Sequence, residues 1–423
     1  MAVIRRLSAL EILDSRGRPT VQATCELADG ASASASVPSG ASTGAAEAHE
    51  LRDGDPRRYG GLGCRTAVHN VVALNNVMTN RHFPTQADLD RTLIELDGTP
   101  DKSQLGANAI LAASIAYARA DSTARGLPLY RHLASTLAPE HEPARLPRPT
   151  VNLFSGGKHA GGQVSIQDVL ICPVAAPTID AAMAATYEVY QAAAALVRQQ
   201  YDMRLLVADE GGLAPPFPDV ETMLADAVTA IRAAGYEPGR DIALCVDVAA
   251  SHFAENGRYR LAGEPLTSAE MIETIAGWLD RYPIISVEDG LAENDWAHWP
   301  LLRRRIGGPG GALVLGDDLL ATNPARIQRA IDANAADALL LKVNQIGTLT
   351  EAAAACRLAR AAGWRVVVSA RSGETEDNWL ADLAVAWSAD QLKVGSITRS
   401  ERLAKWNRLL AIEAETEWPV ASS

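Results

Sequence analysis

Short apolar runs that end in polar or charged residues alternate with helical segments over the second half of the chain. The runs lie at 205–210, 242–247, 283–289, 312–318, 338–342, 365–371 and 391–393. Helical periodicity occupies 178–199, 220–234, 268–280, 323–334, 348–362 and 401–413. Non-alternating apolar strands separated by helices, at intervals of roughly 20 to 40 residues, are typical of a parallel barrel. We therefore expect a (β/α)8 TIM-like barrel whose polar strand ends meet at one mouth.

The first third of the chain instead alternates apolar and polar residues. Two such segments, 20–27 and 31–37, flank Asp29-Gly30, and an Asp-Gly pair between alternating segments is a strong hairpin signal. The small, polar stretch 39–44 predicts a mobile loop. Helical patterns follow at 45–52, 65–80 and 107–125. These features predict a small α+β domain.

Four prolines between Pro139 and Pro149 mark the best candidate linker. We expect an α+β domain over 1–135, a linker over 136–149 and an α/β barrel over 150–423. The chain has 423 residues, of which 48% are hydrophobic and 21% charged, so it can bury a full-sized core.

The net charge excludes some classes of partner. At −12 the chain lacks the basic footprint that nucleic acid or an acidic membrane surface requires, so an anionic substrate must be held by local positive charge. The five cysteines are far apart and form no Cys-x-x-Cys pair, which favours reduced core thiols. With no leader-like or membrane-spanning apolar run, these features predict a cytoplasmic protein.

Three carboxylates, Asp247, Glu288 and Asp317, end three consecutive apolar runs. Three anions at one barrel mouth repel one another unless a hard cation neutralises them, and ligation by oxygen alone favours Mg²⁺. Helix caps and ordinary salt bridges are the alternative interpretation. Three acids in register, followed by lysines, favour the metal.

The next strand ends in Lys342, and a later one ends in Lys393. A lysine close to divalent cations has a lowered pKa and is able to act as a general base, while a second lysine holds a carboxylate. Glu210, which ends the run at 205–210, is the natural acid on the opposite side. Arg371 beside Ser372 offers a fork of donors that suits phosphate or carboxylate. This set predicts proton abstraction next to a carboxylate, with Mg²⁺ stabilising the enolate.

The chain resembles the enolase family (phosphopyruvate hydratases) along nearly its full length. The matching motifs include LDSRG at 13–17, VPSGASTG at 37–44, ADEGG at 208–212, DVAAS at 247–251, EDG at 288–290, GDDL at 316–319, KVNQIGTLT at 342–350 and RSERLAK at 399–405. The resemblance implies a homodimer or larger even assembly and two Mg²⁺ ions, one held by the three carboxylates and a second reached by Ser39.

The resemblance also implies roles for single residues. Lys342 would be the base and Glu210 the acid, with His159 and Asp168 as further catalytic residues. The substrate, a small phosphorylated or phosphonylated carboxylate, would be bound by Gln167, Arg371, Ser372, Lys393 and Ala41. His159 lies in Gly156-Gly157-Lys158-His159-Ala160-Gly161-Gly162, which is similar to the loop that closes over the substrate in this family, and its glycines allow that motion.

Three positions depart from the family pattern. Ala370 stands where enolases have histidine, Asp168 where they have glutamate, and Ser155 where they have asparagine. In the family, that histidine and that glutamate lie near the hydroxyl that leaves during dehydration. The departures therefore suggest that enolate chemistry is kept, that elimination is altered, and that space at Ala370 admits a larger group.

From these departures we expect a diverged paralogue that resembles carboxyphosphonoenolpyruvate synthase, an enzyme of phosphonate and phosphinate natural-product biosynthesis. Two alternatives stay open. One is a conventional enolase that converts 2-phosphoglycerate to phosphoenolpyruvate and water, and the other is a non-catalytic binding protein on an enolase scaffold.

Overall fold

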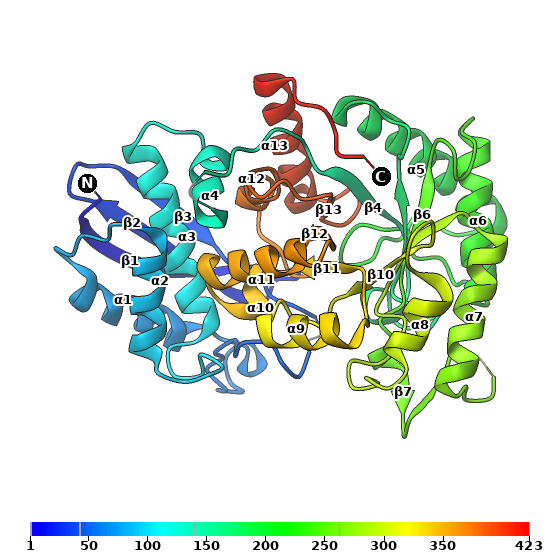
Figure 1. Ribbon diagram of the computed structural model, residues 1–423, viewed down its shortest axis with the longest axis horizontal. Helices are drawn as coiled ribbons and strands as arrows, with labels where there is room; N and C mark the ends of the chain where they lie inside the picture. Colours follow the sequence, from blue (N-terminus) through cyan, green and yellow to red (C-terminus); the bar gives the residue numbers. More distant parts are fainter. Residues whose placement is uncertain (1, 42–43, 139, 262, 423) are drawn as a thin grey trace.

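The computed structural model describes residues 2–41, 44–138, 140–261 and 263–422, and it places a small sheet-and-helix domain beside a closed barrel (Figure 1). The sheet is an antiparallel meander of β1 (Ile4–Leu13), β2 (Pro19–Leu27) and β3 (Ser32–Ser36). The predicted hairpin at Asp29-Gly30 is confirmed, and Gly30 has a φ of 93°, which a side chain would strain. The helices are α1 (Arg65–Met78), α2 (Gln86–Asp97), α3 (Ala107–Ala124) and α4 (Leu129–Leu137), with the 3-10 turn η1 (Tyr59–Gly61).

Helix α3 joins the two parts of the molecule. It is buried on nearly every face, because its many alanines allow close approach of the sheet on one side and of α10 (Val343–Ile346) and α11 (Leu349–Ala361) on the other. Its Arg119 also reaches across to Asp377 of the barrel, at 2.7 and 2.8 Å to the two carboxylate oxygens. The amino-terminal domain is therefore fixed firmly against the barrel mouth.

The helix expected at 45–52 is wrong. The described residues there form turns and extended chain, because their backbone groups bond to other segments: Ala48 N–H donates to Gln345 O, and Ala107 N–H donates to His49 O. This segment lies between the amino-terminal domain and the barrel, which brings its side chains toward the predicted site.

The barrel is closed by eight strands in the order β10-β11-β12-β13-β4-β5-β6-β9. Their bounds are β4 (Arg148–Ser155), β5 (Asp168–Cys172), β6 (Ala243–Asp247), β9 (Ile284–Glu288), β10 (Leu313–Gly316), β11 (Ala338–Leu341), β12 (Arg365–Ser369) and β13 (Gln391–Lys393). The α/β barrel with an α+β domain is thus confirmed. Six of the predicted apolar runs are barrel strands.

Two details of the predicted barrel are wrong. Strand β5 runs antiparallel to both β4 and β6, so the barrel is not wholly parallel; no helix crosses over between β4 and β5, and chains joined in that way pair antiparallel. The run at 205–210 is not a strand. Leu206 is 59% exposed, and a turn in which Ala208 N–H donates to Gly212 O carries Glu210 into the barrel instead.

Helices surround the barrel, as the periodicity predicts. They are α5 (Ile179–Tyr201), α6 (Val220–Ala233), α7 (Ser268–Arg281), α8 (Trp299–Ile306), α9 (Pro324–Ala333), α12 (Trp379–Ala386) and α13 (Ser400–Thr416), with η2 (Gly157–His159), η3 (Ala250–His252) and a small ribbon of β7 (Ala254–Glu255) and β8 (Arg258–Tyr259). The predicted linker, 136–149, covers the segment between α4 and β4 and overlaps the end of α4 and the start of β4. In the described part of the chain, every helix is too short or too polar to cross a membrane.

Candidate active site

The predicted acids and lysines meet at the carboxyl ends of the barrel strands. Lys393 Nζ donates to Asp247 Oδ2 at 2.8 Å and to Glu288 Oε2 at 2.6 Å. Lys342 Nζ lies 2.5 Å from Asp317 Oδ2. All five side chains are nearly buried, so the structure brings together the charge-separated set that the strand ends predict.

The carboxylates suit a hard cation in their chemistry. Glu288 Oε1 is buried and has no hydrogen-bond partner within the described part of the chain, which leaves an oxygen ready for a ligand. Asp247, Glu288 and Asp317 supply oxygen atoms alone, the donor type that Mg²⁺ prefers. These residues therefore fit the implied ion, with the lysine ammonium groups supplying the positive charge in this structure.

Asp289 holds one of these acids in place. Its backbone is in the left-handed region (φ 42°), and its two carboxylate oxygens accept the N–H groups of Asp317 and Asp318 at 2.9 and 2.7 Å. Asp289, Asp317 and Asp318 have carboxylate oxygens within 4.8 Å of one another, which is close enough for a shared metal ion. Asp289, however, already accepts hydrogen bonds that position the other two residues. Gln345 Nε2 also donates to Asp317 Oδ1 at 2.8 Å, so Asp317 is oriented from two sides.

Electrostatics separate the protonation states of these groups. Burial raises the pKa of Asp247, but the charge and hydrogen bond of Lys393, together with the charges of Lys342 and His159, lower that pKa to about 2. The pKa of Glu288 is raised well above its usual value by burial and by the charge of Asp247. Burial lowers the pKa of Lys342, but the charges of Asp317 and Glu288 together raise it, so the amine stays protonated in this state.

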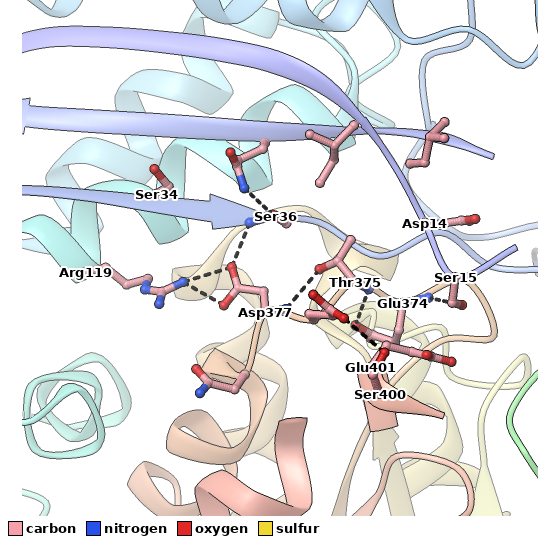
Figure 2. Close-up of a pocket in the computed structure, with 15 residues that line it drawn as sticks. Asp14, Ser15, Ser34, Ser36, Arg119, Glu374, Thr375, Asp377, Ser400 and Glu401 are labelled. Atoms are coloured by element: carbon pink, nitrogen blue, oxygen red, sulfur yellow. Dashed lines mark hydrogen bonds and ion pairs between the residues drawn. The ribbon is translucent and has the colours of Figure 1, made fainter. Parts of the chain in front are cut away.

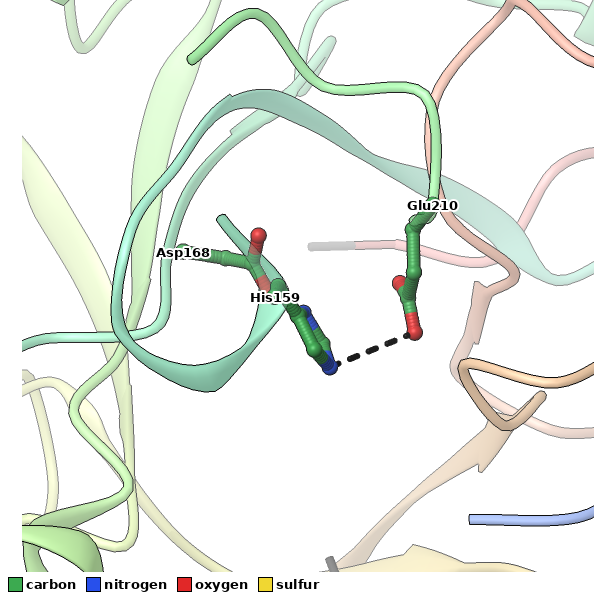
Figure 3. A group of neighbouring side chains, drawn as sticks. All are labelled: His159, Asp168 and Glu210. Atoms are coloured by element: carbon green, nitrogen blue, oxygen red, sulfur yellow. Dashed lines mark hydrogen bonds and ion pairs between the residues drawn. The ribbon is translucent and has the colours of Figure 1, made fainter. Parts of the chain in front are cut away.

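A histidine and two carboxylates form a second close group of side chains (Figure 3). His159 Nδ1 lies 2.9 Å from Asp168 Oδ2, and His159 Nε2 lies 3.8 Å from Glu210 Oε1. His159 is only 9% exposed, so the loop at 156–162 lies closed. The shorter carboxylate of Asp168 still reaches the imidazole, because the closed loop brings the ring to it.

This second group holds a proton. Burial disfavours a charged imidazole, but the charges of Asp168 and Glu210 outweigh burial and raise the pKa of His159 to about 9. Burial raises the pKa of Glu210, but the combined charges of His159, Arg402, Lys393 and Lys342 lower it. Near neutral pH the pair therefore consists of a protonated His159 and an ionised Glu210.

The surroundings of Ala370 correct one expectation. Ala370 lines a cavity of only about 20 Å³, enough for roughly one water molecule. The same cavity is lined by His159, Gln167, Glu210, Asp247, Lys342, Arg371, Ser372, Lys393 and Ala41, among others. This closed form has no space for any substrate, so it shows no extra space at Ala370, where the imidazole is missing. His159 supplies an imidazole to the same cavity.

Arg371 is held by the amino-terminal domain. Its guanidinium donates to the two oxygens of Glu47 at 2.9 and 3.1 Å and to Asn344 Oδ1 at 3.0 Å. Ser372 Oγ, beside it, accepts a hydrogen bond from Arg16 at 3.1 Å. Burial tends to lower the pKa of Arg371, but the charge and hydrogen bonds of Glu47, together with the charges of Asp317 and Asp318, raise it. Both predicted phosphate-binding residues therefore line the cavity.

The other predicted ligands differ in where they lie. Gln167 Nε2 donates to Asp247 Oδ2 at 3.1 Å, within the site. Ser39 Oγ donates to Glu50 at 3.1 Å and accepts from Arg52 at 2.8 Å, so its hydroxyl is engaged inside the amino-terminal domain. The structure therefore does not bring Ser39 to the carboxylates, and its predicted metal contact stays a prediction. Part of its loop, 42–43, lies outside the described residues.

Sequence reasoning missed several residues that position this site, Glu47, Asn152, Asp289 and Gln345, and it named Ser155 only as a departure from the family pattern. Two of them belong to motifs already quoted, the EDG at 288–290 and the KVNQIGTLT at 342–350, where a polar residue beside a predicted ligand was a usable signal. Glu47 lies in a segment that we expected to be helical. Asn152 and Ser155 lie in a strand that the periodicity did not reveal.

Comparison with known proteins agrees with this geometry. A family model described as "Enolase, N-terminal domain" matches residues 4–133, and one described as "Enolase, C-terminal TIM barrel domain" matches residues 143–419. Among curated relatives, "Enolase 1" of Methylococcus capsulatus (strain ATCC 33009 / NCIMB 11132 / Bath) is 48% identical, with 98% of this chain and 97% of that protein covered. The chain belongs to the enolase family and is an enzyme of that superfamily, a lyase.

Proposed function

We propose that this protein is a conventional enolase, which converts 2-phosphoglycerate to phosphoenolpyruvate and water. One observation carries the proposal: Lys342 and the His159–Glu210 pair line the same small cavity, which also presents Arg371 and Lys393. Base, acid and two anion-binding groups are what a dehydration of a phosphorylated carboxylate requires.

This proposal replaces the synthase expectation, which is wrong. The relative named Enolase 1 is 48% identical over nearly the whole of both chains, and this supports the conventional reaction over a specialised paralogue in phosphonate biosynthesis. The physical argument for the paralogue also fails, because His159 and Asp168 still provide an imidazole and a carboxylate beside Glu210.

Each half of the reaction has its own residues. Lys342 removes the proton on the carbon next to the carboxylate, Lys393 holds that carboxylate, and Arg371 with Ser372 holds the phosphate. Magnesium bound by Asp247, Glu288 and Asp317 would stabilise the charge of the enolate and lower the pKa of nearby Lys342. The proton for the leaving hydroxyl comes from the His159–Glu210 pair, which holds one near neutral pH.

We also propose a cytoplasmic homodimer or larger even assembly. All five cysteines are free and buried, which agrees with a reducing compartment. Leu10 and Leu13 of β1 are 57% and 52% exposed, and Leu13 lines a cavity of about 570 Å³ between the two domains, where Arg119 meets Asp377 (Figure 2). A second copy would cover these two exposed leucines. Sedimentation of the native protein tests this, and a monomer at micromolar concentration would contradict it.

The activity test uses the purified chain with 2-phosphoglycerate and Mg²⁺. We expect phosphoenolpyruvate absorbance to rise, and hydrogen on the α-carbon to exchange with deuterium from D₂O. Exchange without any phosphoenolpyruvate would overturn the proposed dehydration while leaving enolate formation intact. Mg²⁺ binding without exchange or product would favour the non-catalytic alternative.

A further inference from the structure

Ser155 makes a contact that no predicted role uses. Its Oγ donates to Asp168 Oδ1 at 2.5 Å, while Asp168 Oδ2 faces His159 Nδ1 at 2.9 Å. Ser155 and Asp168 are both fully buried, at 0% exposure. One carboxylate is therefore held between a hydroxyl and an imidazole, and its orientation depends on both.

The strands explain why the hydroxyl reaches this carboxylate. Ser155 and Asp168 are direct partners in the antiparallel register of β4 and β5, where opposed side chains lie close together. The register shifts between Asn152 and Phe154. Residues three apart in a regular strand face opposite sides, whereas this irregularity lets both Asn152 and Ser155 serve the site, since Asn152 Nδ2 donates to Glu210 Oε2 at 3.1 Å.

Close packing keeps the hydroxyl in place. A Cβ at Gly212 would lie 2.5 Å from Ser155 Oγ, so the glycine of the neighbouring turn makes room for the serine. That turn also carries Glu210. The serine, the histidine loop and the acid are thus packed as one unit.

We propose that Ser155 is a positioning residue for the elimination half of the reaction: by fixing Asp168 it holds the His159 imidazole toward Glu210. This inference rests on the proposed function for its kinetic consequence. Without the hydroxyl, Asp168 is free to rotate, and the imidazole loses the orientation needed to deliver a proton. Lys342 is held by Asp317, so we expect proton abstraction not to depend on Ser155.

The test compares two rates in the same protein, the formation of phosphoenolpyruvate and the exchange of the α-hydrogen in D₂O. For Ser155→Ala we expect product formation to fall about tenfold, because a small misplacement of a catalytic group lowers the rate of the step that it serves. We expect exchange of the α-hydrogen to change less than about twofold. Ser155→Cys keeps the volume but donates weakly, so it should behave like the alanine variant. Ser122→Ala is the matched control, because it removes an equally buried hydroxyl hydrogen bond (2.7 Å to Leu127 O) in the other domain.

Coupling to Asp168 gives a second measurement. In an Asp168→Ala background, loss of the Ser155 hydroxyl should add no further decrease in product formation. An equal fall of both rates in Ser155→Ala, no fall at all, or a further fall in the Asp168→Ala background would each overturn the inference.

A spectroscopic readout separates this inference from the proposed function. In ¹⁵N-histidine-labelled protein without substrate, we expect Ser155→Ala to shift the His159 Nδ1 resonance, and Ser122→Ala to leave it unchanged. If the wild-type protein neither exchanges the α-hydrogen nor forms phosphoenolpyruvate, the proposed function fails. The His159 Nδ1 resonance then remains as the test of the positioning role of Ser155. An unshifted resonance would overturn it.

Discussion

The Arg371 guanidinium and the Glu47 carboxylate form a bidentate ion pair, with N–O distances of 2.9 and 3.1 Å. The two side chains are 4% and 6% exposed. Glu47 comes from the amino-terminal domain and Arg371 from the loop after β12. The group that we expect to bind substrate phosphate thus holds a carboxylate when no substrate is present. Phosphate must share or displace that carboxylate.

Glu47→Gln should therefore tighten binding of the phosphorylated substrate. The amide keeps the shape but removes the charge that competes for Arg371, a difference of about 1 kcal/mol or roughly fivefold in KM. Steady-state kinetics with 2-phosphoglycerate measure this, and Asp55→Asn, which alters an exposed pair with Arg57, serves as the control. A higher KM would show instead that Glu47 orients Arg371 for the substrate.

Lys342→Ala should abolish exchange of the α-hydrogen. Loss of the general base costs at least about 100-fold. Hydrogen–deuterium exchange followed by NMR gives the rate. Lys102→Ala is a matched control, because Lys102 is also a nearly buried lysine with one carboxylate partner, Glu351 at 2.9 Å. Undiminished exchange in Lys342→Ala would remove this lysine as the base.

Glu288→Gln should weaken Mg²⁺ binding. The wild-type protein should gain about 2.7 kcal/mol of unfolding free energy when Mg²⁺ is present at 100 times its Kd, since only the folded state binds the ion tightly. Thermal unfolding with Mg²⁺ and with EDTA measures this gain. The gain should disappear in Glu288→Gln and persist in Glu273→Gln, which alters an exposed pair with Arg305. A full gain in Glu288→Gln would exclude Glu288 as a ligand.

The charged His159 should stabilise the fold in a defined pH range. Its pKa rises from 6.5 to about 9 on folding, so its contribution is fully present below pH 6.5 and is lost as the pH rises through 9. The excess unfolding free energy of the wild type over His159→Gln should shrink by about 3 kcal/mol between pH 6 and pH 10. Urea unfolding at pH 6 and pH 10 tests this. A constant difference between the two variants would mean that folding does not raise the pKa of His159.

The apolar runs were sufficient to predict six barrel strands. The polar residues that end those runs were sufficient to predict the group of acids and lysines at the barrel mouth. Each run is continuous in the chain, and parallel strands that end in charge bring those charges together. Strands β4 and β5 were missed because a buried antiparallel pair with a register shift has neither clean alternation nor a helix between its members. The run at 205–210 looked like a strand, but its exposed Leu206 belongs to a turn.

By itself, the sequence determined the family, the barrel and the residue types available for chemistry, because motifs and periodicity are local properties of the chain. Only the tertiary structure decided what the departures at Ala370, Asp168 and Ser155 mean. Residues 13 apart in sequence, Ser155 and Asp168, are opposed in the sheet, and a closed loop brings His159 against that carboxylate. Whether an imidazole and a carboxylate reach Glu210 depends on distances across strands, and those distances arise only when the barrel closes.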